Sequence, residues 1–152
     1  MDLTIEHSAL CAALVAQVAD AVIFADRNGR IQVWNAAAEA VFGYAAEEVV
    51  GERLDVLIPE RLRAAHWDGF SNAIESGRLR HGRESIITRS QHKDGRALYV
   101  DLSFALVKDD SGQVVGSVSI ARDATERFQA QKASRRRIAE LEAQVQSAQP
   151  VE

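Results

Sequence analysis

Apolar residues in the first part of the chain change their spacing every few positions, which predicts short elements of alternating type. Residues 3–18 place apolar side chains three and four positions apart toward their end, a pattern typical of an amphipathic helix. Residues 21–25 are apolar and residues 31–34 alternate, and the Asn28-Gly29 pair between them is a strong tight-turn signal. Together these two segments predict a β-hairpin.

The segment after this hairpin predicts a series of helices. Asn35 stands before an alanine-rich run and suits an N-cap, because its side-chain oxygen can accept a hydrogen bond from an early helical N–H. Gly43 suits the end of that helix. One or two short helical turns follow up to Pro59. Residues 60–76 then show helical spacing, with Pro59 at their start and Gly77 at their end.

The second half of the chain predicts three strands and a final helix. Turn signals separate residues 83–91, 97–107 and 114–121, and the middle segment alternates apolar and polar side chains. From Asp123 the chain is polar and helix-prone to about Val145. One antiparallel sheet with helices over one face is the simplest arrangement that buries these apolar faces, so we predict the α+β class.

Composition and charge narrow the class of protein. The chain has 152 residues, the usual length of one domain, and its 47% hydrophobic content is that of an ordinary globular protein. No apolar run is long enough to span a membrane and the start of the chain lacks a signal-peptide pattern, so we expect a cytoplasmic protein. The net charge of −4 argues against a nucleic-acid partner, and the single cysteine, Cys11, excludes an internal disulfide.

Motifs of known catalytic centres are absent from the sequence. The chain contains no glycine-rich phosphate loop. His92, Lys93 and Asp94 have no serine or cysteine nucleophile at a recognisable spacing, so they indicate a turn and not a catalytic triad. We therefore predict that this chain is not an enzyme.

Five segments, in their order and spacing, resemble the PAS family of sensory domains. They are AVIFADRNGRIQVWN, AEAVFGYAAEEVVG, LIPERLR, the HKDG turn before a long strand, and the closing ARDATER. The resemblance implies a five-stranded antiparallel sheet with helices over one face and a pocket for a small molecule or cofactor between them. It also implies a role in signal transduction, of the kind found in bacterial two-component signalling.

The same resemblance divides the chain into four parts. Residues 20–122 correspond to the PAS domain. Residues 1–19 form an N-terminal flanking helix for dimerisation, residues 123–146 a C-terminal signalling helix, and residues 147–152 a frayed tail. In the family, the junction after the last strand carries the signal to the output helix.

Two residues of this junction, Asp123 and Thr125, are therefore the expected signal relay, and either can also cap the helix that follows. Within that helix Ile138, Leu141 and Val145 are spaced as in a short coiled-coil seam. We expect a homodimer through the terminal helices, and a protein effector, fused or in trans, that receives the signal.

The segment LIPERLRAAHWDGF resembles the matching helix of oxygen-sensing haem-PAS proteins, in which a histidine is the axial ligand of the haem iron. The matching residue is His66, and Arg80 falls where a cation pairs with a haem propionate. The positions that hold an arginine or methionine on the distal side in that subgroup are Ile86 and Glu84 here. A haem b pocket in this chain would therefore be largely apolar on its distal side.

The residues expected to bind a cofactor are His66, Arg80, Ile86, Leu102, Phe104 and Ile120. A flavin–cysteine adduct is not expected, because the helical block after Asn35 contains no cysteine. The alternative, which the sequence favours over haem ligation, is that His66 is a purely structural histidine near the start of a covering helix.

Three functions stay open at this level. The first is a non-catalytic sensory module that binds a small ligand. The second is a haem-based gas sensor with His66 as the iron ligand. The third is an adaptor that dimerises or binds a protein partner with no ligand in its core.

Overall fold

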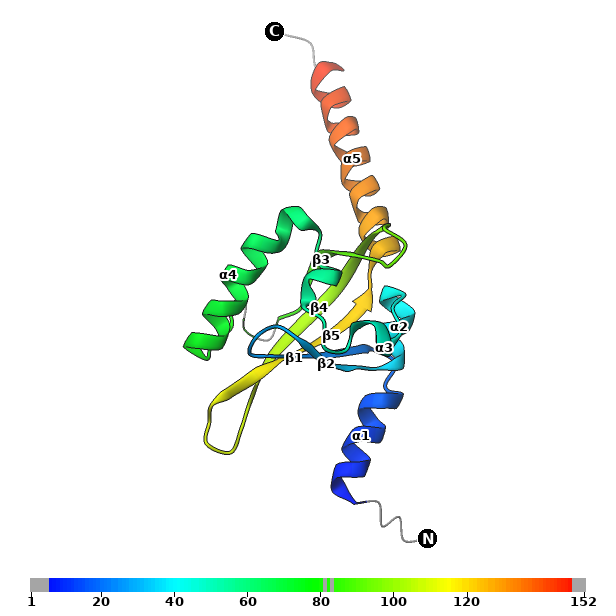
Figure 1. Cartoon of the computed structure of the whole chain (residues 1–152). Helices are drawn as coiled ribbons and strands as arrows, with labels where there is room; N and C mark the ends of the chain where they lie inside the picture. The colour runs from blue at the N-terminus through cyan, green and yellow to red at the C-terminus, as the bar shows by residue number, and fades with distance from the viewer. Residues whose placement is uncertain (1–5, 81, 83, 149–152) are drawn as a thin grey trace.

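The computed structural model describes residues 6–80, 82 and 84–148 and shows one sheet with helices over one of its faces (Figure 1). The strands are β1 (Ala21–Asp26), β2 (Ile31–Trp34), β3 (Ile86–Gln91), β4 (Ala97–Lys108) and β5 (Val114–Asp123). The helices are α1 (His7–Gln17), α2 (Ala36–Phe42), α3 (Ala46–Val49), the 3-10 helix η1 (Leu54–Leu57), α4 (Glu60–Ser76) and α5 (Thr125–Ala148). All four strand pairs are antiparallel, in the order β2-β1-β5-β4-β3. The predicted α+β fold is confirmed.

Local signals in the sequence place several element ends correctly. The Asn35 side chain accepts a hydrogen bond from the Ala38 N–H at 2.9 Å, so it caps α2 as predicted. Gly43 ends α2 with a φ of 83°, a left-handed conformation that suits glycine. Pro59 and Gly77 flank α4 as predicted.

Other boundaries differ from the prediction. Strand β3 begins at Ile86 and not at residue 83, which lies outside the described residues. Strand β5 extends to Asp123, because the last two residues of β5 continue the ladder with β4. Helix α5 therefore starts at Thr125, and it continues through Ala148 because no proline or glycine interrupts it before that point. The predicted start of the first helix, residues 3–5, lies outside the described residues.

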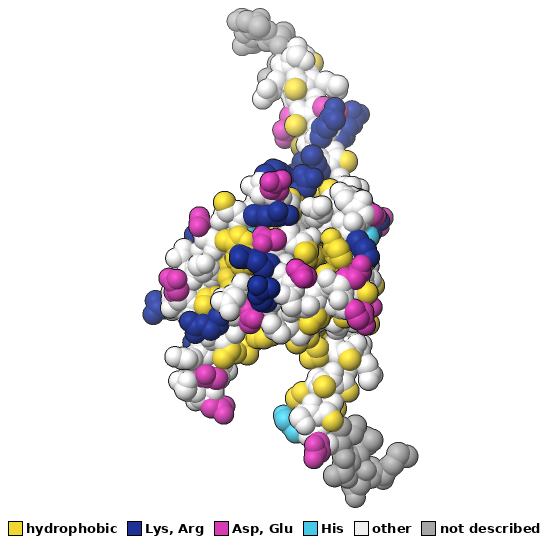
Figure 2. Space-filling model, in the orientation of Figure 1, with side chains coloured by type: hydrophobic (Ala, Val, Ile, Leu, Met, Phe, Trp, Pro, Cys, Tyr) yellow, Lys and Arg dark blue, Asp and Glu magenta, His cyan; other side chains and the backbone are white. Residues whose placement is uncertain are grey.

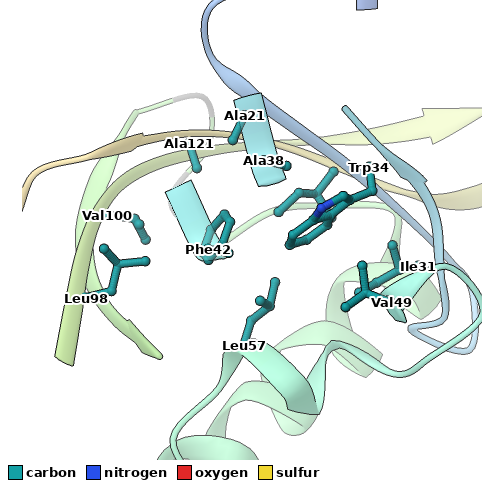
Figure 3. Close-up of a cluster of buried hydrophobic side chains, with 11 residues drawn as sticks. Ala21, Ile31, Trp34, Ala38, Phe42, Val49, Leu57, Leu98, Val100 and Ala121 are labelled. Carbon is teal, nitrogen blue, oxygen red and sulfur yellow. The ribbon is translucent and has the colours of Figure 1, made fainter. Parts of the chain in front are cut away.

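The hydrophobic core lies at one end of the sheet, under α2 and α3 (Figure 3). Phe42 of α2 is 2% exposed, and its ring centroid lies 5.4 Å from that of Trp34 on β2. The Trp34 indole N–H donates a hydrogen bond to the Tyr44 carbonyl at 3.0 Å. The core cluster consists of Ala21, Ile23, Ile31, Trp34, Ala38, Phe42, Val49, Leu57, Leu98, Val100 and Ala121.

Helices α1 and α5 project from the domain in opposite directions (Figure 1). Neither contains a buried residue, and both expose apolar side chains to solvent (Figure 2). The large exposed ones are Leu10 and Leu14 on α1 and Ile138, Leu141 and Val145 on α5. Over the residues that the structure describes, no helix combines the length and the apolar character needed to cross a membrane.

Candidate functional site

A cavity of about 340 Å³ lies between the inner face of the sheet and the helices that cover its other end. Its floor is formed by β3, β4 and β5 together with Ile23 of β1, and its roof by η1 and α4. Phe42 of α2 borders the cavity on the side of the packed core. The floor residues include Ile86, Thr88, Val100, Leu102, Phe104 and Ser119. The roof residues include Leu54, Leu57, Ile58, Leu62, Ala65 and His66.

A second cavity, of about 230 Å³, lies next to the first, toward the C-terminal end of α4. His66, Phe104 and Ser119 line both cavities, so these residues mark the boundary between two lobes of one site. We call this site the two-lobed cavity. Arg80 and Glu84 lie at the smaller lobe and are exposed, which places one charge of each sign at its opening.

Small side chains on both the helix and the sheet explain why this end is hollow. Helix α4 has a single buried residue, Ile74, and it presents Ala65 and Gly69 to the lobes. Opposite them β5 contributes Ser117 and Ser119. At these positions the facing side chains are too short to meet, so a gap remains between the larger apolar side chains around it.

Trp67 holds the N-terminal half of α4 against the rest of the domain. Its indole N–H donates a hydrogen bond to the Asp55 carboxylate at 2.8 Å, and the Arg53 guanidinium lies 4.1 Å from the ring centroid. The ring also packs under the β1–β2 turn, where a Cβ on Gly29 would lie 2.3 Å from it. The roof of the cavity is therefore tied to the hairpin at one point.

His66 precedes Trp67 in the sequence, and its side chain lines both lobes. Its ring lies edge-on to Trp67, with centroids 4.9 Å apart, and stacks on Phe70 at 6.0 Å. Its Nδ1 is buried and has no hydrogen-bond partner within the described part of the chain. Burial lowers the pKa of His66, and the nearby Asp55 carboxylate opposes this shift by a smaller amount.

The His66 ring is therefore neutral near pH 7, and it offers one donor and one acceptor. A buried polar atom without a partner is unfavourable, so the Nδ1 atom of His66 lowers the stability of the domain. A neutral imidazole can also coordinate iron. Among the described residues, no cluster of three histidine, cysteine, aspartate or glutamate side chains is placed to hold a metal ion by itself.

The structure brings most of the predicted site residues together. His66, Ile86 and Phe104 line both lobes, Leu102 lines the larger lobe, and Arg80 lines the smaller one.

The prediction for Ile120 is corrected, because this residue lines neither lobe. It is the cross-strand partner of Val22 and Ser103, and paired residues share a face of the sheet. The neighbouring pair Phe104 and Ser119 faces the cavity, so Ile120 faces the opposite side.

Ser117 and Ser119 are among the cavity residues that the sequence pattern did not reveal. Strand β5 carries small or apolar residues on both faces, so its alternation does not reveal which face is covered. The signal that could have found them is the register of the β4–β5 hairpin, which pairs Ser119 with Phe104 and Ser117 with Leu106.

The junction after β5 attaches α5 to the start of β4. The Ala124 N–H donates to the Tyr99 carbonyl at 2.7 Å, and the Tyr99 N–H donates to the Thr125 hydroxyl at 3.0 Å. The Phe128 ring stacks on that of Tyr99, with centroids 3.9 Å apart. The Asp123 carboxylate accepts a hydrogen bond from the Thr125 N–H at 2.9 Å. Both predicted relay residues therefore lie where the helix meets the sheet.

Known proteins share this fold and part of this sequence. A family model described as the PAS fold matches residues 9–124. The oxygen sensor protein DosP of Escherichia coli is 33% identical over 103 residues, which cover 68% of this chain and 13% of DosP. The sensor protein FixL of Bradyrhizobium diazoefficiens is 31% identical over 116 residues, which cover 75% of this chain and 22% of FixL. The chain thus spans less than a quarter of either relative.

Solved structures agree with this match. The crystal structure of a PAS domain from Colwellia psychrerythraea superposes with a TM-score of 0.67 at 26% identity, over 77% of this chain and 96% of that one. The structure of an RNA-binding light-oxygen-voltage receptor superposes with a TM-score of 0.70 at 21% identity, over 96% of this chain and 41% of that one. The second likeness concerns the fold alone.

Proposed function

The chain belongs to the PAS fold family, and from this premise we propose that it is a non-catalytic sensory module. A small ligand binds in the two-lobed cavity and changes the way in which α5 is held. Helix α5 passes this change to an effector protein, fused or in trans.

One observation carries this proposal: β4 takes part in both the cavity and the attachment of α5. Leu102 and Phe104 form part of the cavity floor. Three residues earlier, Tyr99 holds the first turn of α5 through backbone hydrogen bonds and its ring. A ligand that binds two arrangements of β4 with different affinity would shift the population of α5 arrangements.

Asp123 and Thr125 are the proposed relay residues. The Thr125 hydroxyl accepts a hydrogen bond from the Tyr99 N–H, and the Asp123 carboxylate accepts one from the Thr125 N–H. Replacing both by alanine is expected to weaken the response of α5 to a ligand while the affinity for that ligand stays nearly the same. Undiminished signalling in the double variant would contradict the relay.

Ligand binding is tested with two matched serine variants and a fluorescent apolar probe, anilinonaphthalene sulfonate. Ser119→Leu places an isobutyl group in the cavity, and Ser103→Leu places the same group on the opposite face of the sheet. The probe is expected to bind the wild type and Ser103→Leu and to lose its fluorescence enhancement in Ser119→Leu. Equal binding by both variants would overturn the proposal. Native mass spectrometry of the freshly purified wild type would reveal a retained ligand.

A haem-based gas sensor is the second candidate, and the place of His66 at the boundary of both lobes favours it. The residues present fit this group: His66 offers a neutral imidazole as iron ligand, Ile86 and Phe104 offer apolar walls, and Arg80 at the smaller lobe offers a cation for a propionate. Haem would supply an iron that binds a gas. The name of the relative DosP, an oxygen sensor protein, agrees with this candidate.

Titration with haemin separates this candidate from the first. A Soret band that appears in the wild type and in His92→Ala, and is lost in His66→Ala, would support it. A missing band, or a band that persists in His66→Ala, would reject haem and leave the proposal of another ligand to the probe experiment.

We also propose that the module forms a homodimer through its terminal helices. Ile138, Leu141 and Val145 lie exposed on α5 at spacings of three and four, and Leu10 and Leu14 lie exposed on α1. Light scattering is expected to give twice the chain mass for the wild type and a lower mass for Leu141→Lys. A dimer that binds neither the probe nor haemin would instead favour a ligand-free adaptor.

A further inference from the structure

Asn35 does more than cap α2. Its side chain is buried, and both of its polar atoms are fully used. The Oδ1 atom accepts hydrogen bonds from the Ala38 N–H and the Val22 N–H, each at 2.9 Å. The Nδ2 atom donates to the Val15 carbonyl at 2.9 Å and to the Asp20 carbonyl at 3.0 Å. One side chain thus links α1, the segment before β1, β1 itself and α2.

The hydrogen bond to the Val15 carbonyl shows how α1 is held, because it reaches the last turn of that helix. The final carbonyls of a helix have no partner inside the helix. Helix α1 ends at Gln17, so the Val15 carbonyl is one of these, and Asn35 satisfies it from within the domain. This contact fixes where α1 ends relative to the sheet, although α1 has no buried residue of its own.

A second link joins the same segment to β5. The Arg122 guanidinium donates two hydrogen bonds to the Asp20 carboxylate, Nε to Oδ1 at 2.5 Å and Nη2 to Oδ2 at 2.9 Å. Such a paired arrangement fixes direction as well as distance. Arg122 is three residues before the start of α5, and Ala21 pairs with Ala121 beside it.

We propose that Asn35, Asp20 and Arg122 form one joint that sets the direction of α1 relative to α5, so that a movement of β5 reaches both terminal helices together. The three residues act as positioning residues. The mechanical part of this inference stands without a ligand. Only its use in signalling rests on the proposed sensory function.

Pulsed electron paramagnetic resonance can measure the joint directly. Nitroxide labels are placed on Cys11, which is the chain's single cysteine and is exposed on α1, and on a cysteine introduced by Ser134→Cys on the exposed side of α5. The labelled protein is assembled with an excess of unlabelled Cys11→Ser chains, so that distances within one chain dominate. The intact joint is expected to give a single narrow distance peak.

Asn35→Asp is the selective variant. It keeps an oxygen that accepts from Ala38 and Val22, and it replaces the donor that serves α1 by an atom that cannot donate. Arg122→Gln removes the ion pair at an exposed position. Both variants are expected to lose the single peak while the far-ultraviolet circular dichroism and the thermal midpoint show a folded domain.

Two further proteins make the result decisive. Lys93→Gln removes the same charge as Arg122→Gln from a surface pair with Glu48 on another part of the domain, and it is expected to keep the single peak. Asp20→Arg combined with Arg122→Asp restores an ion pair of reversed polarity and is expected to recover the peak. An unchanged peak in the folded Asn35→Asp and Arg122→Gln variants would overturn the joint, as would an equal loss in Lys93→Gln. No ligand is present, so this result is independent of the probe and haemin experiments.

Discussion

The two ends of the sheet are covered in different ways. At the α2 end, Phe42 and Trp34 interlock over the strands, and the Trp34 indole is hydrogen-bonded to the chain that follows α2 (Figure 3). At the α4 end, a helix of 17 residues buries only Ile74 and lies over a two-lobed cavity. The same strands β4 and β5 run beneath both ends.

This difference indicates which end of the sheet stabilises the fold and which end leaves room for a ligand. Large side chains packed on all sides contribute most of the free energy that holds a domain together. The large apolar side chains that line the cavity have fewer contacts on the side that faces it, so this end contributes less to stability, but it leaves room for a ligand. Because the strands are shared, the packed end can keep the fold intact while the hollow end is empty or occupied.

The sharpest test of this comparison is a pair of identical truncations. Phe42→Ala removes a fully buried ring from the packed end and is expected to lower the free energy of unfolding by about 3–5 kcal/mol. Phe104→Ala is expected to cost less than about 2 kcal/mol, because that ring is only half-buried and borders both lobes, whereas Phe42 borders the larger lobe alone and is otherwise enclosed. Urea unfolding monitored by circular dichroism measures both. Equal losses would mean that the two ends are not different in packing.

A pair of asparagines gives the next largest difference. Asn35→Ala leaves two N–H groups and two carbonyls without their partner, and it is expected to cost about 1–3 kcal/mol. Asn72→Ala, at an exposed position on α4, is expected to change the free energy of unfolding by less than about 0.5 kcal/mol. Thermal unfolding of both variants checks this contrast. A similar loss in Asn72→Ala would show that α4 is more tightly held than its burial indicates.

A substitution at the hollow end is expected to have the opposite sign. His66→Leu removes the buried Nδ1 that has no partner, so we expect a gain of about 1 kcal/mol at pH 7.5 in the absence of ligand. The same urea experiment measures it, with His92→Leu as a histidine control outside the cavity. A clear loss of stability in His66→Leu would show that the histidine has a structural role and not a ligand-binding one.

The smallest effect is a dependence on pH. Burial lowers the pKa of His66 below its ordinary value of 6.5, so the unfolded chain takes up a proton before the folded one does. The uptake of this proton by the unfolded chain lowers the free energy of unfolding as the pH falls below 6.5, by at most about 1.4 kcal/mol per pH unit, and has little effect above that value. His66→Leu should lack this component when unfolding is measured between pH 7.5 and 5.

The acidic groups act in a separate range. Hydrogen bonds from Arg122 and Arg127 lower the pKa values of the Asp20 and Asp101 carboxyls respectively. Their contribution is present above their ordinary value of 3.8 and is lost as the pH falls below it. A wild type and a His66→Leu variant that lose stability in parallel between pH 7.5 and 5 would therefore contradict the assignment to His66.

Local chemistry explains which parts of the fold could be predicted from the sequence. Asn35, Gly43 and Gly77 act within a few residues of the ends that they mark, so a short window of sequence contains the full signal. Which residues of β5 face the cavity could not be predicted in the same way. Small or apolar residues occupy both of its faces, and only pairing with Phe104 selects Ser119 over Ile120.

The candidate site was predictable in part. His66 was identified from the resemblance of its helix to that of haem-PAS proteins and Phe104 from the alternation of its strand, and both line the cavity. The further bonds of Asn35 could not be predicted, because they join residues 13 to 20 positions apart in the chain. A cap is a local property of the sequence, whereas a link between helices appears only once the chain has folded.

The chain contains two tryptophans, and the fold assigns one to each end of the sheet. Trp34 belongs to the packed core, and Trp67 anchors the helix over the cavity through Asp55 and the turn at Gly29. Trp34→Phe would leave a protein whose tryptophan emission comes from the cavity roof alone, and Trp67→Phe one whose tryptophan emission comes from the core alone. The molecule therefore contains its own optical reporters, which can follow the opening of the roof and the melting of the core as separate events.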